Sequence, residues 1–224
     1  TWKQRDWNDD SQWRKLLRWT GDAQAVELYK DLAWGEIVVY TVVFGDYDRL
    51  QSPRITQYGI RYVSFTDKPI DVEGWENVVV DVDDPLFASR RYKALSHEYF
   101  PSARWTIYHD GNMSLRWTPR RILEELTSAK AEIVATRHPF NKDAYQEGAW
   151  VIGKGYTDPE TVQRMLAKYR DEGLPDGGGC YQCGFLVRRH TPAVMAFNRL
   201  WWAEIESGSH RDQISFPYAA WRAG

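Results

Sequence analysis

The chain has 224 residues, and 29 lysine and arginine side chains against 31 aspartate and glutamate side chains give a formal net charge of -2. This near-neutral balance provides no overall field to attract nucleic acid or an acidic membrane, so we expect no nucleic-acid partner. No apolar run approaches the roughly 20 residues that cross a bilayer, and the start, TWKQRDWNDDSQW, is too polar for a secretory signal. We therefore expect a cytoplasmic protein without a transmembrane segment in this chain. The start at Thr1 rather than Met also suggests one domain of a longer protein, which would allow membrane association through a further region or a partner.

The first 34 residues differ in pattern from the rest. In residues 1–34, tryptophans, leucines and other apolar residues recur near the helical period among many charged residues. We interpret 1–34 as an N-terminal helical segment that packs on the domain or on a neighbour. Residues 35–224 are predicted to form one main α/β domain, which is long enough to bury a full core.

The first three predicted strands each run into an acidic residue. The stretch EIVVYTVVFGDYD (36–48) contains a continuous apolar run from Ile37 to Phe44, typical of a strand that is covered on both faces. The segments GIRYVSFTD (59–67) and ENVVVDVDD (76–84) predict two more strands. Acidic residues at the ends of parallel strands meet at the carboxyl edge of the sheet, where α/β folds bind ligands.

Strands and helices then alternate along the chain. A strand is expected before Asp110, and the segments 132–139 and 183–190 are also strand-like. Three helix starts carry one signal, an N-cap residue followed directly by proline. They are Thr118, Asp158 and Thr191. This order predicts an α/β fold with a mixed, mostly parallel, Rossmann-type sheet that is flanked by helices.

The sequence Asp-Gly-Asn, residues 110–112, has the spacing of a D-x-D metal motif whose second acid is replaced by an amide. Asp110 would emerge at a strand tip, Gly111 would allow a sharp bend, and Asn112 would present an amide oxygen. One carboxylate, one carbonyl and diphosphate oxygens would suit Mg²⁺ or Mn²⁺. Taken alone, the three residues are better explained as an ordinary turn.

A cluster of cations precedes this strand in the segment SRRYKALSHEYFP. Arg90 and Arg91 lie just before Lys93, and His97 lies one helical turn beyond it. Such cations could neutralise a phosphate or diphosphate leaving group. On sequence alone, a solvated helix face is the better explanation.

Histidines and a late acidic residue offer further candidates. His138 and His190 each end a predicted strand, so either could bind a metal or a substrate, although a strand-end histidine is more often structural. Asp212 and Gln213 begin a predicted helix, where a carboxylate can contact hydroxyls or act as a base. The simpler interpretation of this pair is a charged first helical turn.

The cysteine and tryptophan contents give weaker signals. Cys180 and Cys183 form a C-x-x-C pair, which cannot complete a zinc site without two further ligands. We interpret both as small packing residues at the entrance to a strand. Twelve tryptophans are compatible with carbohydrate stacking, but most are expected to pack in the core.

Seven sequence blocks together resemble a family of glycosyltransferase-like domains from bacteria and plants, related to plant mucilage and cell-wall glycosyltransferase-like proteins. The resemblance covers about residues 36 to 218, and the order of the blocks makes it more specific than any single one. The blocks are VVYTVVFGDYD (38–48), VSFTD (63–67), RRYKALSHEYFP (90–101), TIYHDGNM (106–113), RHPFNKDAYQEG (137–148), YRDEGLPDGGGCYQCGFLVRRH (169–190) and WWAEIESGSHRDQISF (201–216).

This resemblance implies a GT-A-like glycosyltransferase domain over residues 35–224, with a nucleotide half, a metal motif and an acceptor half. It implies Asp110 and Asn112 as the site of Mn²⁺ or Mg²⁺, although the second acid of the motif is missing at Asn112. The residues that it implies for nucleotide and donor binding are Thr41, Phe44, Gly45, Tyr47, Asp67, Arg91, Lys93 and Gln213. The catalytic residues that it implies are Asp212, Glu147 and His138.

The predicted function is metal-assisted transfer of a sugar from a nucleotide-sugar donor to a glycan or glycolipid acceptor, as in polysaccharide biosynthesis. Two other functions stay open. A metal-dependent hydrolase that used Asp110, His138 and His190 would require these residues to form a dense cluster. A non-catalytic glycan-binding module would suit the amide at Asn112 and would lack a nucleotide pocket.

Overall fold

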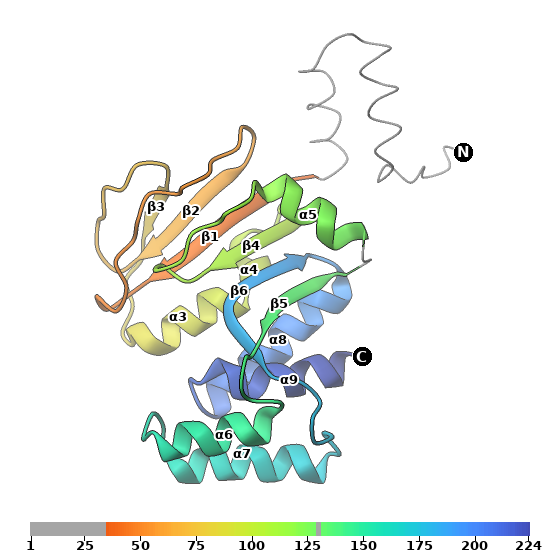
Figure 1. Ribbon diagram of the computed structural model, residues 1–224. Coiled ribbons are helices and arrows are strands. Elements are labelled where there is room, and N and C mark those ends of the chain that lie inside the picture. Colours follow the sequence, from red (N-terminus) through yellow and green to blue (C-terminus); the bar gives the residue numbers. More distant parts are fainter. Residues whose placement is uncertain (1–34, 129–130) are drawn as a thin grey trace.

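The computed structural model describes residues 35–128 and 131–224 (Figure 1). The predicted N-terminal helical segment, 1–34, lies outside the described residues. Within the described part of the chain, no helix is both long and apolar enough to cross a bilayer. The predicted α/β class is confirmed, because helices flank both faces of one mixed, mostly parallel sheet.

Six strands form this sheet in the order β3-β2-β1-β4-β6-β5. The strands β1 to β4 run parallel, whereas β6 is antiparallel to both of its neighbours, β4 and β5. Their bounds are β1 Ile37–Val43, β2 Arg61–Thr66, β3 Glu76–Val79, β4 Trp105–His109, β5 Ile133–Arg137 and β6 Tyr181–Arg189. All six lie within or across the segments that the apolar runs predict.

The central strand β1 is buried on both faces, as its continuous apolar sequence requires. Val38 and Tyr40 pack in a core with helices α3, α8 and α9, and Ile37 and Val39 pack on the opposite face with α5. Figure 1 shows α5 on one side of the sheet and α3, α8 and α9 on the other. The sheet is therefore held between two apolar layers, which leaves the strand ends as the place for polar chemistry.

Several helices begin at a capping residue that the sequence marks. Asp158 and Thr191 accept hydrogen bonds from the first turns of α7 and α8, as predicted, and proline is the first helical residue in both. Asp84 caps α3 in the same way, so the predicted third strand, 76–84, stops early at Val79. The bounds are α3 Pro85–Ala94, α4 Ser96–Tyr99, α5 Pro119–Ser128, α6 Ala144–Gly153, α7 Pro159–Asp171, α8 Pro192–Ser207 and α9 Asp212–Ala223.

A buried arginine fixes the end of α3 against the sheet. Arg188 on β6 is fully buried and donates hydrogen bonds to the carbonyl oxygens of Lys93 and Ala94, at 2.6 and 2.8 Å. The Tyr40 hydroxyl donates to the same Lys93 carbonyl at 2.9 Å. Cationic and hydroxyl donors thus satisfy carbonyls that a helix end leaves without partners. They also fix the backbone that carries the Lys93 side chain.

Both cysteines are free and buried, as expected for packing residues. Burial raises the pKa of Cys180 to about 12 and that of Cys183 well above its usual value. Neither thiol therefore provides a reactive thiolate at neutral pH.

His190 follows β6 and is expected to make folding pH-dependent. Burial and the charge of Arg188 lower the pKa of His190 to about 4, against about 6.5 in an unfolded chain. Between these values the unfolded chain binds a proton that the folded chain does not, so stability is lost as the pH falls from about 6.5 toward 4. Urea unfolding should show that the wild type loses about 2 kcal/mol more than His190→Gln between pH 7 and 5. Equal losses in both proteins would contradict this assignment.

Candidate functional site

The carboxyl ends of β1, β2 and β4 meet at one edge of the sheet, as the parallel pairing requires. After β1 the chain turns at Gly45, whose positive φ of 67° suits glycine, and Asp46 follows with a φ of 56°. The Gly45 amide donates to Asp67 Oδ2 at 2.6 Å, which ties the end of β1 to the end of β2. Asp67, the acid predicted at the end of the second strand, therefore lies at this edge, and its role in binding stays a prediction.

A buried ammonium group lies at the centre of this edge. Lys93 Nζ is 2.9 Å from Asp212 Oδ2 and 3.3 Å from Asp110 Oδ1, and the lysine is only 3% exposed. Burial alone would lower the pKa of Lys93, but the two carboxylates outweigh it and raise the pKa above its usual value. One cation therefore joins the acid that follows β4 to the first residue of α9, and these two acids are 102 residues apart in the chain.

Asp110 is held in place from three sides. The Tyr108 hydroxyl donates to Asp110 Oδ1 at 2.6 Å, and the Asp110 amide donates to the carbonyl of Gly184 at 2.9 Å. A Cβ on Gly184 would lie 2.7 Å from Asp110 Oδ2, so only glycine at this position leaves room for the carboxylate. Among the described residues, Oδ2 has no hydrogen-bond partner, which leaves it available to a ligand.

Asp48 is a site residue that the sequence interpretation missed. A Cβ on Gly111 would lie 3.1 Å from Asp48 Cβ, so the loop after β1 passes close to the turn that follows Asp110. Partial burial and the charge of Asp110 raise the pKa of Asp48, against the opposing charge of Lys93. Asp48 therefore lies beside the turn at Gly111, close enough to Asp110 for the two charges to interact. Asn112 is exposed and, within the described chain, makes no hydrogen bond to Asp110.

Arg90, rather than the predicted Arg91, is the arginine that faces the site. Arg90 Nε lies 3.8 Å from Asp212 Oδ2 and donates to the His210 carbonyl at 3.2 Å, whereas Arg91 is exposed. The helical period explains the difference, because Arg90 is three residues before Lys93 and shares its face of α3. Spacing alone could have identified it.

The structure separates the residues that are predicted to line the nucleotide pocket. Thr41 is fully buried within β1, and Phe44 is 4% exposed and packs edge-on against Tyr92. Gly45 is exposed, and Tyr47 is 87% exposed at the loop surface. Thr41 and Phe44 therefore shape the core beneath the loop. Nucleotide binding by these residues stays a prediction.

Glu147, His138 and Gln213 lie around the start of α9, on the other side of Asp212. Glu147 is fully buried on α6, accepts a 2.6 Å hydrogen bond from Asn141, and lies 3.8 Å from His138 Nε2. Arg211 approaches the free oxygen Oε1 of Glu147 at 3.9 Å and donates to Gln213 Oε1 at 3.3 Å. Both predicted catalytic carboxylates thus flank the first turn of one helix.

A metal site at His138 is disfavoured by hydrogen bonding. Within the described part of the chain, only His138, Glu147 and Cys180 gather three metal-binding side chains, with ligand atoms within 4.8 Å of one another. However, His138 Nδ1 accepts hydrogen bonds from the amides of Asn141, at 2.8 Å, and Phe140, at 3.3 Å. A neutral imidazole that accepts through Nδ1 has its proton on Nε2, which then has no lone pair for a metal.

The cluster that a metal-dependent hydrolase would require does not form. His190 lies beside the start of β4, where Nε2 is 3.1 Å from Thr106 Oγ1, whereas Asp110 follows the other end of this strand. His138 lies next to Cys180, beyond the end of β5. The three residues of that hypothesis are therefore distributed along the sheet.

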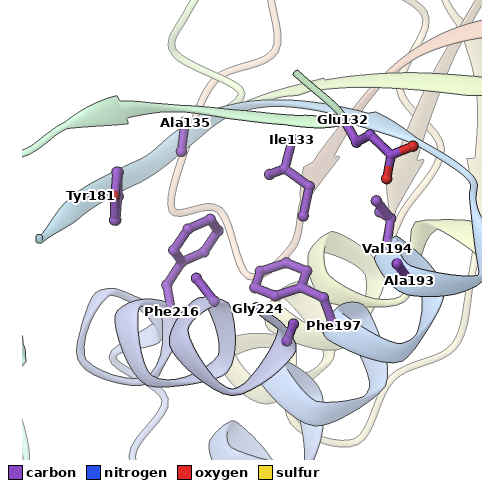
Figure 2. Close-up of a pocket in the computed structure, with 11 residues that line it drawn as sticks. Glu132, Ile133, Ala135, Tyr181, Ala193, Val194, Phe197, Phe216 and Gly224 are labelled. Atoms are coloured by element: carbon purple, nitrogen blue, oxygen red, sulfur yellow. The ribbon is translucent and has the colours of Figure 1, made fainter. Parts of the chain in front are cut away.

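A cavity of about 270 Å³ lies away from this edge, between β5, β6 and the helices α8 and α9. Figure 2 shows Phe197 and Phe216 pointing from the helices toward the strands that carry Ile133 and Ala135. Its lining is mostly apolar, with Glu132 at one side. Nothing in its lining matches the charged chemistry of the carboxyl edge.

Gly184→Ala should test the tight packing around Asp110. The added Cβ would meet Asp110 Oδ2 at 2.7 Å and displace the carboxylate, at a stability cost near the lower end of about 1–3 kcal/mol. We expect donor turnover to fall at least about 10-fold while the far-ultraviolet spectrum is unchanged. Gly153→Ala is the matched control for stability and for turnover without an acceptor, because its Cβ would meet no atom within 4 Å. Equal activity of the two variants would contradict a role for this contact.

Comparison with known proteins identifies the family of this chain. Residues 63–224 match the model of the TOD1/MUCI70 glycosyltransferase-like domain family. The chain is 28% identical over 211 residues to the probable hexosyltransferase MUCI70 of Arabidopsis thaliana. That alignment covers 80% of this chain and 36% of the relative. The chain is 20% identical over 221 residues to the alkaline ceramidase TOD1 of Arabidopsis thaliana, covering 81% of this chain and 47% of that protein. The chain thus spans less than half of the length of either curated relative. Because the family model matches most of its length, the chain belongs to the TOD1/MUCI70 glycosyltransferase-like domain family.

Proposed function

We propose that this domain transfers a hexose from a nucleotide-sugar donor to a hydroxyl of a glycan or glycolipid acceptor. The observation that carries the proposal is the buried Lys93 ammonium between Asp110 and Asp212 at the carboxyl edge of the sheet. A fixed cation at this edge suits the negative charge that develops on a diphosphate leaving group. The hexosyltransferase relative supports a hexose as the transferred sugar.

The oxygen ligands at this edge suit a hard divalent cation such as Mn²⁺ or Mg²⁺. Asp110 offers its free Oδ2, and Asp48 lies close to Asp110 in the loop after β1. In this proposal Asp48 replaces the second acid that is missing at Asn112. When bound, the cation would neutralise diphosphate oxygens and so make the diphosphate a better leaving group.

The two catalytic carboxylates have different environments, which suggests different roles. Burial alone would raise the pKa of Asp212, but Lys93 and Arg90 outweigh it and lower the pKa below its usual value. A carboxylate this firmly ionised is a poor base, so we assign Asp212 to holding Lys93 and contacting the donor sugar. Glu147 Oε1 is buried without a hydrogen-bond partner, which makes Glu147 the better candidate for the base.

In the proposed reaction, the bond between the sugar anomeric carbon and the diphosphate oxygen breaks, and its electron pair stays on the diphosphate. The acceptor hydroxyl oxygen forms the new bond to that carbon, and its proton passes to Glu147. Lys93 and Arg90 stabilise the leaving group, and His138 Nε2 lies 3.8 Å from Glu147 Oε2. Because Lys93 and Arg90 are already held beside Asp212, their positive charges are in position before the donor binds.

One relative is named a ceramidase, an enzyme that hydrolyses an amide, but no group of residues in 35–128 or 131–224 favours hydrolysis over transfer.

The proposal is tested by incubating the protein with single nucleotide sugars, Mn²⁺ and hexose oligosaccharides, and by measuring release of the nucleoside diphosphate. We expect release with at least one hexose donor and an increase on addition of an acceptor. Absence of release from every UDP-, GDP- and ADP-hexose, by folded protein, would refute the proposed function. Release of fatty acid from ceramide under the same conditions would support hydrolysis instead.

A further inference from the structure

Two large aromatic rings lie uncovered beside the candidate site. Trp150 near the end of α6 and Tyr156 in the following loop are 42% and 49% exposed, and their ring centroids are 5.5 Å apart at an interplanar angle of 70°. Gly153 and Gly155 lie between the two aromatic residues in the chain, and a Cβ on either glycine would meet no atom within 4 Å. The space next to these two glycines is therefore open. Single exposed aromatic residues are common, but a packed pair with free space beside it is typical of a ligand surface.

Arg211 connects this pair of rings to the catalytic carboxylates. Its guanidinium lies over the Tyr156 ring, 5.4 Å from the centroid. The same group donates to Gln213 Oε1 at 3.3 Å and approaches Glu147 Oε1 at 3.9 Å. Because Arg211 also precedes Asp212 directly, the rings, Glu147 and the Lys93–Asp212 pair are joined through one short segment.

Two polar atoms, one on Arg211 and one on the nearby Glu147, are buried without a hydrogen-bond partner. Glu147 is fully buried and its Oε1 has no hydrogen bond, and Arg211 Nε is also unsatisfied. A buried polar atom without a partner costs roughly 1–3 kcal/mol, so such atoms are usually satisfied by a ligand or by water. A ligand hydroxyl between these side chains would satisfy an acceptor and a donor together.

We propose that Trp150, Tyr156 and Arg211 form the acceptor subsite, named here the aromatic platform, and that it binds a hexose ring of a glycan chain. The apolar C–H face of the sugar packs on the two rings, and its hydroxyls contact Arg211 and Glu147. An acyl chain would leave these charged groups without partners, so a sugar is the occupant that satisfies both parts of the surface. This inference rests on the proposed function and names the substrate class of its acceptor side.

Tyr156→Ala and Trp150→Ala test the aromatic platform, and Trp221→Ala is the matched control. Trp221 is 38% exposed near the C-terminal end of α9, whereas Arg211 lies at the other end of that helix. We expect each platform variant to raise the KM for an oligosaccharide acceptor about 10-fold or more. Donor hydrolysis without an acceptor and donor affinity should be unchanged, and Tyr156→Phe should restore the acceptor KM.

An unchanged acceptor KM in both platform variants would overturn the proposal, and so would a loss of donor affinity, because the rings would then belong to the donor pocket. A second measurement does not depend on turnover: saturation-transfer NMR with a mixture of malto-, cello- and galacto-oligosaccharides. We expect signals on the sugar ring protons that disappear in Tyr156→Ala and persist in Trp221→Ala. Absence of these signals in the wild type would also overturn it. Failure of donor release, with these signals retained, would refute the transferase function and leave the glycan site standing.

Discussion

Lys93→Met is expected to destabilise the protein by about 3–5 kcal/mol and to abolish donor turnover. The change removes the cation between Asp212 and Asp110 but keeps most of the side-chain volume, so two neighbouring carboxylates lose their shared partner. For a domain of this size the cost corresponds to a fall in Tm of roughly 6–20 °C. Differential scanning calorimetry measures the stability, and nucleoside diphosphate release measures the activity.

The double variant Lys93→Met with Asp212→Asn separates stability from function. Removing the buried charge of Asp212 together with its partner should recover at least half of the lost stability, because the uncompensated charge causes most of the cost. Activity should stay absent, since the leaving-group cation is still missing. Recovery of turnover along with stability would show that Lys93 serves only the fold.

Asp110→Asn is expected to reduce Mn²⁺ affinity at least about 100-fold with a loss of stability below about 1 kcal/mol. Loss of an outer-shell partner already costs a metal site 10–100-fold, and a direct ligand should cost more. The amide keeps the size of the side chain, and Lys93 retains Asp212 as its partner at 2.9 Å. Electron paramagnetic resonance of free Mn²⁺, in the presence of a nucleoside diphosphate, measures binding without relying on turnover.

Two further variants separate the possible second ligands of that metal. Asp48→Asn should weaken Mn²⁺ binding about 10-fold or more, because Asp48 lies close to Asp110. Asn112→Ala should bind Mn²⁺ as the wild type does, because Asn112 is exposed. If Asn112→Ala weakened Mn²⁺ binding and Asp48→Asn did not, Asn112 would be the second metal ligand, as the D-x-D spacing predicts.

Local sequence signals are sufficient for much of the fold. The apolar run of β1 indicates a strand buried on both faces, and the N-cap and proline pairs at Asp158 and Thr191 mark the starts of α7 and α8. The direction of β6 was not predictable, because periodicity is the same for parallel and antiparallel strands. Helix α6 was also missed, because its N-cap Asp143 is followed by Ala144 and not by the proline that marks the other starts.

The candidate site was predictable only in part, because its residues come together through tertiary structure. Lys93, Asp110 and Asp212 were found from the resemblance, and the structure joins all three. Asp48 was missed because its position depends on the turn after β1 and on the absence of a side chain at Gly111. No short-range pattern in the sequence contains that information.

Thermal-shift screening of nucleoside diphosphates with and without Mn²⁺ tests the central claim most directly. A ligand that binds only the folded state raises stability by about 2.7 kcal/mol at 100 times its Kd, which a shift in Tm detects readily. We predict a Tm increase for at least one of UDP, GDP and ADP, larger with Mn²⁺ than without it and absent in Lys93→Met with Asp212→Asn. A folded wild-type protein whose Tm none of them changes would contradict a nucleotide-sugar site at this edge of the sheet.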